Sequence, residues 1–315
     1  MGKFSIGIDV GGTKIAYGLF DDSANLVAKR AHPSDSTCPP EPFFDRIALE
    51  ALQLAADNAV TKTDLLGVGV GVPSYVKYDE GRIVKTVNLT CLNDFPARDY
   101  LSAKLGLPVA LANDAQAAAL AEHRHGAGRG FSSMLYCPVS TGISSAVIID
   151  GRLFRGSYGW AGETGHAIIT PGEGILCGCG NRGCLMSYVS GSMIVKHVQQ
   201  KLEEGERSIL PELAGDASRI TARHIQEGYD LNDPLSRWAV AQMARYMAVW
   251  LYNLYVTFNI NCFVFGGGLL KFGDRLFPAV RAQFDAYNQS SLPVYFKNAE
   301  LTEDFGIVGA MELLR

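Results

Sequence analysis

Apolar residues near the N-terminus follow the alternating pattern that is typical of strands. Residues 4–20 alternate apolar and polar positions on either side of Gly11-Gly12, which predicts a strand, a tight turn and a second strand. Residues 65–72, LLGVGVGV, form a continuous apolar run that predicts a buried strand. This strand must end at Pro73, because proline has no N–H group for the ladder.

Helical spacing of apolar residues marks most of the segments between the predicted strands. It is clear in the alanine-rich run 115–126, where the composition itself favours a helix. The predicted helices are 43–58, 96–105, 115–126, 190–205, 218–228, 233–258, 274–288 and 306–314. Further strands are predicted at 81–84, 109–111, 262–265 and near Val294. Since strands alternate with helices, the pattern indicates an α/β protein with helix-covered sheets.

The strand–turn–strand pattern of the N-terminus returns in residues 133–149, at an offset of 129 positions. Ile8 then corresponds to Cys137 and Leu19 to Ile148, while Gly12 corresponds to Thr141 in a second small-residue turn. Both halves read as strand, small-residue turn, strand, polar turn and strand. We interpret the repetition as an internal duplication of a hairpin that could cradle phosphate.

Composition narrows the class of protein. A length of 315 residues suits two domains, and 48% hydrophobic with 19% charged residues is typical of a soluble globular chain. The net charge of −4 gives no support for a nucleic-acid partner. The most apolar span, 246–265, is interrupted by three asparagines, so we expect no membrane span. No signal peptide pattern opens the chain and four cysteines are scattered, which favours the cytoplasm.

The stretch 163–186 holds four residues of the types that bind metals: His166, Cys177, Cys179 and Cys184. Glycines between them allow the turns that bring sulfur atoms toward one point. Three thiolates and an imidazole are a typical ligand set of a closed, tetrahedral structural zinc site. Small buried apolar residues or a disulfide are the alternatives. The number and type of ligands favour zinc.

The turn after the first strand has the composition of a phosphate site. Gly11 and Gly12 let a phosphate approach the backbone N–H groups, while Thr13 and Lys14 add a hydroxyl and a positive charge. Asp9, at the strand end, could position a hydrated Mg²⁺ beside those phosphates. An ordinary glycine hairpin turn is the alternative.

Asn113 and Asp114 lie between the predicted strand 109–111 and the helix that follows. A carboxylate at the N-terminus of a helix is kept ionised, which suits a general base that accepts a hydroxyl proton during phosphoryl transfer. Asparagine and aspartate are also the usual N-cap residues, so a plain cap is the alternative reading.

Two further small-residue turns follow predicted strands and could receive a nucleotide, the first its phosphates and the second its adenosine. Their residues are Ser140, Thr141, Gly142, Gly266, Gly267 and Gly268.

Taken together, these segments resemble the ROK family (repressors, open reading frames and sugar kinases) of the hexokinase–actin–Hsp70 superfamily. The matching stretches are IGIDVGGTK, ANDAQAAALAE, IDGRLFRGSYGWAGETGH, CGCGNRGCL, VFGGGL and DFGIVGAMELL, which extend from residue 6 to residue 314.

The resemblance implies two ribonuclease-H-like domains with the active site in the cleft between them. We expect a small domain at 1–117, completed by a C-terminal helix at 300–315, and a large domain at 118–299 with the zinc site and nucleotide turns. It also implies ATP and Mg²⁺ as cofactors and a homodimer as the assembly.

Residue by residue, the resemblance implies that Asp9 orients Mg²⁺ and that residues 11–14 bind phosphates. Asp114 would be the general base for a sugar hydroxyl, usually that on carbon 6. The residues expected to hydrogen-bond sugar hydroxyls are Asn88, Asn113, Glu163 and His166. Cys177, Cys179 and Cys184 would bind zinc with one ring nitrogen of His166, whose other nitrogen would face the sugar.

Two positions depart from the family pattern. Kinases of this family commonly carry glutamate directly after Gly-Cys-Leu, where it contacts hydroxyls around carbon 1 and carbon 2, and this chain has Met186. A thioether accepts only weak hydrogen bonds, so the pocket suits glucose less well there. The second phosphate turn usually reads Gly-Thr-Gly, and here it begins with Ser140.

These features predict an ATP-dependent sugar kinase that acts on the 6-hydroxyl of a hexose or N-acetylhexosamine. A sugar-responsive repressor is disfavoured, since such proteins carry a helix-turn-helix before the first strand and only five residues precede Ile6. A catalytically weak or inactive sugar-binding protein is the other alternative, which Met186 and Ser140 favour and Asp114 disfavours.

Overall fold

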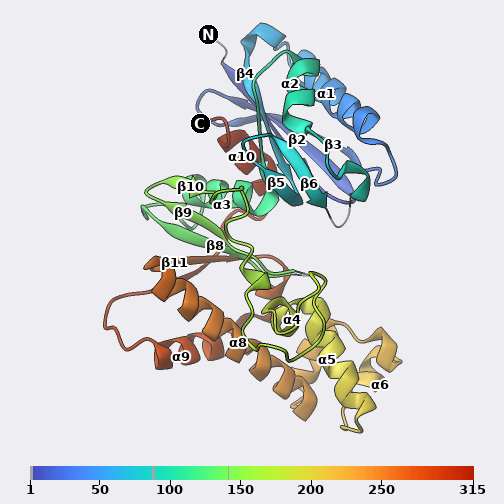
Figure 1. Ribbon diagram of the computed structural model, residues 1–315, viewed down its shortest axis with the longest axis vertical. Helices are drawn as coiled ribbons and strands as arrows, with labels where there is room; N and C mark the ends of the chain where they lie inside the picture. The colour runs from blue at the N-terminus through green and yellow to red at the C-terminus, as the bar shows by residue number, and fades with distance from the viewer. Residues whose placement is uncertain (1–2, 87–88, 141) are drawn as a thin grey trace. The chain divides into compact units, whose positions relative to one another are not determined.

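In the computed structural model, which describes residues 3–86, 89–140 and 142–315, a five-stranded sheet occupies the first third of the chain (Figure 1). Its order is β3-β2-β1-β4-β7. The strands are β1 (Phe4–Val10), β2 (Lys14–Asp21), β3 (Leu26–Pro33), β4 (Leu65–Val72) and β7 (Val109–Asn113). The first three are antiparallel neighbours, while β4 and β7 run parallel to β1. The predicted strand–turn–strand at 4–20 and the strand at 65–72 are therefore confirmed.

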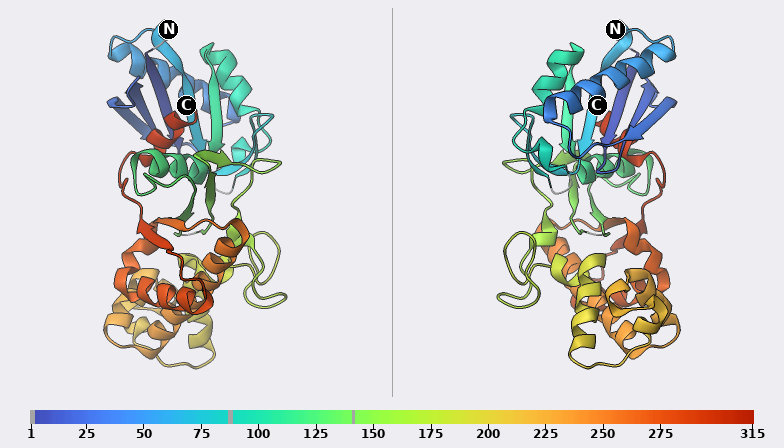
Figure 2. Two further views of the ribbon diagram at one scale, coloured as in Figure 1. Left: turned by 90° about the vertical axis from the view of Figure 1, so that its left-hand side faces the viewer. Right: turned by 90° about the vertical axis from the view of Figure 1, so that its right-hand side faces the viewer.

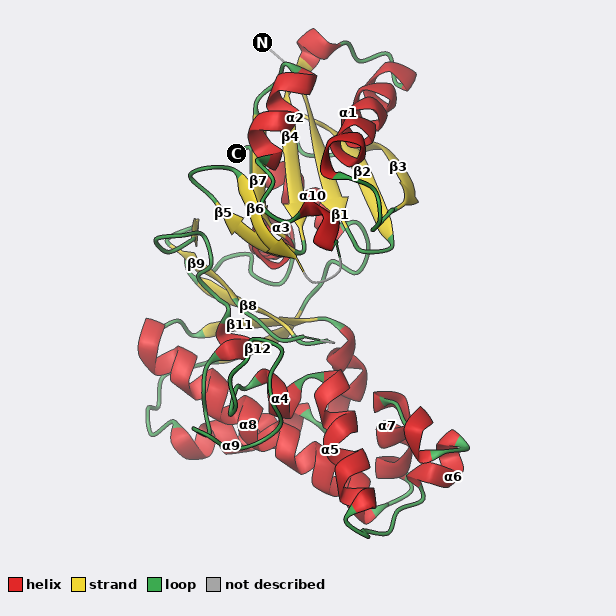
Figure 3. Ribbon diagram, turned by 45° about the vertical axis from the view of Figure 1, so that its right-hand side comes forward, coloured by secondary structure: helices red, strands yellow, loops and turns green. Residues whose placement is uncertain are grey.

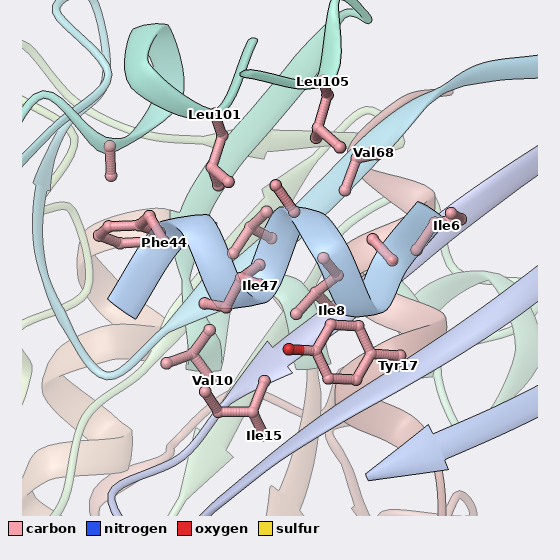
Figure 4. Packing of buried hydrophobic residues seen from close by; sticks show 14 of the residues in the cluster. Ile6, Ile8, Val10, Ile15, Tyr17, Phe44, Ile47, Val68, Leu101 and Leu105 are labelled. Atoms are coloured by element: carbon pink, nitrogen blue, oxygen red, sulfur yellow. The ribbon is translucent and has the colours of Figure 1, made fainter. Parts of the chain in front are cut away.

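The two faces of this sheet are covered differently. Side chains alternate along β1, so Ile6 and Ile8 point to the face that carries α1 (Pro40–Asp57) and α2 (Ala97–Leu105). Figure 4 shows these isoleucines close to α1, whose Phe44 and Ile47 belong to the same buried cluster. Gly7 lies on the opposite face, which carries α10 (Phe305–Glu312). Large apolar side chains thus cover one face of the sheet. On the other face, the backbone of α10 packs directly against the backbone of the sheet.

Helix α10 lies unusually close to the sheet because glycines line the contact. A Cβ atom at Gly7 or Gly69 would overlap the carbonyl oxygen of Ile307 or Ala310 in α10. Gly309 of α10 comes similarly close to the backbone of α3 (Asp114–His125). Figure 2 shows α10, in red, beside the blue strands. These positions require glycine because any side chain would push the helix away.

Charged groups hold the far end of α10. The carboxylate of Glu312 is buried and accepts hydrogen bonds from Arg124 and from His125 Nε2, the latter at 2.6 Å. The buried Glu122 accepts a bond of 2.8 Å from the N–H of Leu301, just before α10. The predicted C-terminal helix at 306–314 is therefore confirmed and firmly attached to α3.

A second five-stranded sheet has the order β10-β9-β8-β11-β12, which repeats the order of the first. Its strands are β8 (Met134–Pro138), β9 (Ala146–Ile149), β10 (Arg152–Phe154), β11 (Cys262–Gly266) and β12 (Tyr295–Asn298). The antiparallel pairs β8–β9 and β9–β10 correspond to β1–β2 and β2–β3 of the first sheet. The parallel pair β11–β12 corresponds to β4–β7. The shared order supports the predicted internal duplication.

The remaining elements are mostly helical. The helices are α4 (Met186–Val189), α5 (Gly191–Glu203), α6 (Leu210–Ala214), α7 (Ala222–Asp230), α8 (Pro234–Phe258) and α9 (Phe277–Tyr287). Short 3-10 helices are η1 (Lys62–Asp64), η2 (Thr90–Leu92), η3 (Thr164–His166), η4 (Ala217–Arg219) and η5 (Gly268–Arg275). A two-stranded sheet pairs β5 (Ser74–Lys77) with β6 (Arg82–Thr86), where the sequence predicted one strand. The long α8 packs against α5, α7 and α9 (Figure 3).

The chain divides into two compact units: 1–136 with 146–162 and 299–315, and 137–145 with 163–298. The expected division placed 118–136 and 146–162 with the large domain. In the compact units they accompany the N-terminal residues, because α3 packs against both α10 and β9. Across the described residues, no helix combines the length and apolar character that a bilayer crossing needs.

Candidate active site

The turn between β1 and β2 faces solvent with its polar groups. The N–H of Gly11 donates to the carbonyl of Lys14 at 2.9 Å, which closes the turn, and a Cβ at Gly11 would crowd the same carbonyl. The N–H of Ser34 donates to the carbonyl of Thr13 at 3.0 Å and ties the turn to the end of β3. Thr13 and Lys14 are exposed, so their hydroxyl and ammonium groups are available to an anion.

Asp9 lies at the carboxyl end of β1, where its backbone pairs with Ala16 of β2 and Gly71 of β4. Burial raises the pKa of the Asp9 carboxyl, and the positive charge of Lys14 partly offsets this effect. Its side chain lies against Gly306 in the first turn of α10. A carboxylate oxygen suits Mg²⁺, which is commonly held by one or two carboxylates and several waters.

Asn113 and Asp114 take separate roles at the start of α3. Asn113 is the N-cap residue, and its side-chain oxygen accepts from the N–H of Ala115 at 2.9 Å and of Gln116 at 3.4 Å. Its amide nitrogen donates to the carbonyl of Ser74 in β5 at 3.2 Å. Asn113 is therefore the N-cap, and the N–H of Ala115 also donates to Asp114 Oδ1 at 2.8 Å. Asp114 is the first helical residue and its side chain is exposed.

The predicted nucleotide turns of the second unit meet at one pocket. The N–H of Gly191, at the start of α5, donates to the carbonyl of Ser140 at 2.9 Å, and Ser140 Oγ lies close to Gly268. Gly267 has φ +89°, where a Cβ would crowd Val139. The adjoining pocket has a volume of about 290 Å³, near the lower limit of ligand sites. It is lined by Ser140, Gly191, Ser192, Ala222, Arg223, Gln226, Gly268, Leu269, Lys271 and Phe272.

The four predicted metal ligands converge. One ligand atom from each of His166, Cys177, Cys179 and Cys184 lies within 4.8 Å of the others. Cys177 Sγ is 3.5 Å from His166 Nδ1, and Cys179 Sγ is 3.6 Å from Cys184 Sγ. Ligands of a tetrahedral zinc ion are separated by roughly 3.5–3.8 Å, as follows from Zn–S and Zn–N bond lengths. The donor set and these two distances therefore fit zinc.

Backbone bonds bring the cysteines together. The N–H of Cys177 donates to the carbonyl of Asn181 at 2.8 Å, and Gly183 has φ +82° with no room for a Cβ beside the carbonyl of Thr170. Burial lowers the pKa of the His166 imidazole, which favours the neutral, metal-binding form. Burial raises the pKa of the Cys184 thiol to about 12, and a metal must overcome this because only the thiolate binds it.

The same cluster positions the predicted sugar ligands. Glu163 precedes the short helix η3, which ends at His166. Gly165 is buried against the carbonyl of Ile143, and Thr164 Oγ1 donates to Ser145 Oγ at 3.1 Å. With Nδ1 directed to Cys177, the other ring nitrogen of His166 is left for a different partner.

The predicted site residues thus fall into two groups. The first unit holds Asp9, Gly11, Gly12, Thr13, Lys14, Asn113 and Asp114. The second holds Ser140, Gly142, Glu163, His166, Cys177, Cys179, Cys184, Gly266, Gly267 and Gly268. Asn88 and Thr141, which the sequence also predicted for the site, lie outside the described residues.

Three contributors were not predicted: Ser74, which bonds Asn113, Gly191, which bonds Ser140, and Gly306, which touches Asp9. All three meet their partners only through tertiary packing. Met186 begins α4, and its Cε would lie 3.8 Å from a Cβ at Gly142, so this side chain is beside the second phosphate turn.

Two sheets of the same order, each with a small-residue turn after its first strand, define a duplicated α/β fold of the actin-like ATPase class. The ROK family model matches residues 5–315, and the chain belongs to this family. The predicted family membership and fold class are therefore confirmed.

Relatives resemble the chain over nearly its whole length. A glucokinase from Streptomyces coelicolor is 32% identical over 99% of this chain and 97% of its own length. An N-acetylmannosamine kinase from Salmonella paratyphi A is 30% identical over 97% and 96%. The crystal structure of a ROK family glucokinase from Streptomyces griseus, in complex with glucose and AMPPNP, superposes with a TM-score of 0.77 at 30% identity. It covers 98% of both chains.

Proposed function

We propose that this ATP-dependent sugar kinase of the ROK family phosphorylates the 6-hydroxyl of a hexose or N-acetylhexosamine, with Asp114 as the general base. The observation that carries the proposal is the place of Asp114 at α3: Asn113 is the N-cap, and Asp114 is the first helical residue with an exposed carboxylate. At the first helical position the helix dipole favours the ionised carboxylate, which is the form that accepts a proton.

The sugar is held in this proposal by Asn88, Asn113, Glu163 and His166. Resemblance to both a glucokinase and an N-acetylmannosamine kinase supports a six-carbon sugar without choosing between the two types. Met186, beside the second phosphate turn, would offer a sugar hydroxyl only a thioether, which is a weak hydrogen-bond acceptor. We therefore place this chain's selectivity among sugars at Met186.

ATP is bound in the proposal by residues 11–14 and Ser140–Gly142 at its phosphates and by Gly266–Gly268 beside its adenosine. Support comes from the exposed Thr13 and Lys14 and from the pocket beside Ser140 and Gly268. Asp9 would hold hydrated Mg²⁺, which when bound neutralises charge on the phosphates. Lys14 would stabilise the charge that develops as the phosphoryl group moves to the sugar oxygen.

Zinc in the Cys177–Cys179–Cys184–His166 cluster is proposed as a structural ion, because four protein ligands leave no open position. We also propose a homodimer and a cytoplasmic location, where ATP is available and thiols stay reduced. Light scattering on the purified protein would measure the assembly.

The deciding experiment measures ADP release with hexoses and N-acetylhexosamines as acceptors, in the presence of MgATP. We expect turnover on at least one sugar and a 6-phosphate product by NMR. A protein with full zinc content and no turnover on any acceptor would instead be a non-catalytic sugar-binding protein.

A further inference from the structure

Gly306, the second residue of α10, touches the side chain of Asp9. A Cβ atom at Gly306 would overlap Cγ and Oδ2 of Asp9 and would lie 2.9 Å from its Cβ. Real Cβ atoms are not found so close to other heavy atoms, so only the hydrogen of glycine fits. The carboxyl group of Asp9 and the first turn of α10 are thus in close contact, with no room for a larger residue at Gly306.

The Asp9 side of this contact is fixed by the sheet. Asp9 pairs with Ala16 on one side and with Gly71 on the other, so its backbone lies in the middle of three hydrogen-bonded strands. It points to the same face as Gly7, which is the face that α10 covers. Its backbone therefore cannot move away from the helix without breaking the sheet.

The helix side is equally fixed. Gly309 packs directly on the backbone of Ala117 in α3, and Glu312 is bound by Arg124 and His125 at the end of α10. Because both sides are held, the space that Gly306 leaves determines where the Asp9 carboxyl can lie.

We propose that Gly306 is a positioning residue, which directs the Asp9 carboxylate toward the metal–nucleotide complex. The steric part rests on the structure alone, while the metal part rests on the proposed function, in which Asp9 holds hydrated Mg²⁺. C-terminal helix α10 thereby contributes to metal binding without donating a ligand. Groups that orient ligands in this way typically change metal affinity by about 10- to 100-fold when altered.

The test combines Gly306→Ala with Asp9→Ala in a double-mutant cycle followed by urea denaturation. Gly306→Ala destabilises the protein by crowding Asp9, and Asp9→Ala removes the two atoms that collide most severely. The loss caused by Gly306→Ala is therefore expected to be smaller in the Asp9→Ala background. This readout needs no turnover, so it stands even if the kinase assignment fails.

The second measurement is Mn²⁺ binding in the presence of ADP, followed by electron paramagnetic resonance. Gly306→Ala is expected to weaken Mn²⁺ binding about tenfold or more, and to raise the Mg²⁺ requirement of turnover similarly with little change in the KM for sugar. Gly18→Ala is the matched control. Its Cβ crowds the side chain of Ile307 in the same helix, and Asp9 is not among its close neighbours.

The outcomes separate cleanly. The proposal is supported if Gly306→Ala is energetically coupled to Asp9→Ala and weakens Mn²⁺ binding, while Gly18→Ala shows neither effect. If Gly306→Ala does not fold but the double variant does, the steric step is likewise supported. Equal destabilisation in both backgrounds, failure of both variants to fold, or unchanged Mn²⁺ binding overturns it.

Discussion

The two compact units hold their candidate site residues by different physical means. In the first, Asp9 and Asp114 lie on regular elements, a strand end and a helix start, that are fixed by close packing around α10. In the second, Glu163 and His166 lie in a stretch with little regular structure, whose side chains converge on a cysteine–histidine cluster. A small segment with few backbone ladders needs another source of rigidity, and the proposed zinc ion would supply it through its four ligands.

The two halves of a duplicated fold therefore need not hold their site residues in place by the same means. Damage to packing should affect the first unit, and loss of zinc should affect the second. Four variants test this contrast.

Asp114→Asn should have the largest effect on activity. The change keeps size and helix position but removes the proton acceptor, so we expect kcat to fall about 10²- to 10⁴-fold. Sugar binding, measured by calorimetry, should change little. Asp99→Asn is the control, because Asp99 also lies in the first turn of a helix and is exposed, with an ion pair to Arg98. An unchanged kcat in Asp114→Asn would remove Asp114 from the mechanism.

Cys184→Ser should have the largest effect on stability. It removes a buried ligand from the proposed four-ligand zinc site, so zinc content by mass spectrometry should fall and the free energy of unfolding should drop by more than about 4 kcal/mol. Cys38→Ser is the matched control, a half-buried thiol in the first unit that leaves the cluster intact. Native protein without zinc, or a Cys184→Ser variant of normal stability, would show that the second unit is not held by metal.

Gly309→Ala tests the packing of the first unit. Its Cβ would overlap the backbone of Ala117, so α10 and α3 must separate, and overpacking of this kind costs about 1–3 kcal/mol. Zinc content should not change. Gly178→Ala is the control, since Gly178 lies between two metal ligands and a Cβ there meets no atom within 4 Å. If Gly309→Ala lost zinc while Gly178→Ala kept it, the two units would not be independent.

The contrast also explains what could be read from the sequence. Strand alternation, glycine turns and the cysteine–histidine spacing are local patterns, so the α/β class, the duplication and the convergence of the four candidate ligands could be predicted. The glycines at the contacts of α10 could not, since Gly7, Gly69 and Gly309 are far apart in the sequence and meet their neighbours only after folding.

The same limit applies to the start of α3. Asparagine and aspartate are both good N-cap residues, and which of the two caps the helix depends on backbone geometry that residue type alone does not determine. The structure assigns the cap to Asn113, partly through its bond to Ser74 from a hairpin about forty residues earlier.

Asp9→Asn should have the smallest effect on stability, and the sign of this effect distinguishes a functional residue from a structural one. Burial raises the pKa of Asp9 in the folded protein, so its ionised form is destabilising there. A group with a raised folded pKa favours folding below its unfolded pKa of about 3.9, and this contribution is lost as pH rises through the folded value. Asn cannot ionise, so Asp9→Asn should be more stable than the native protein at pH 7. The gain should shrink as pH falls toward 4.

Urea denaturation of both proteins between pH 4 and pH 7, without nucleotide or divalent metal, measures this gain. The contrast between the units is sharpened if Asp9→Asn gains stability while losing Mg²⁺-dependent turnover, because the first unit then retains a destabilising carboxylate for its chemistry. A loss of stability at pH 7 would instead make Asp9 part of the packing that holds α10. The first unit would then depend on its site residues for folding, as the second depends on its metal ligands.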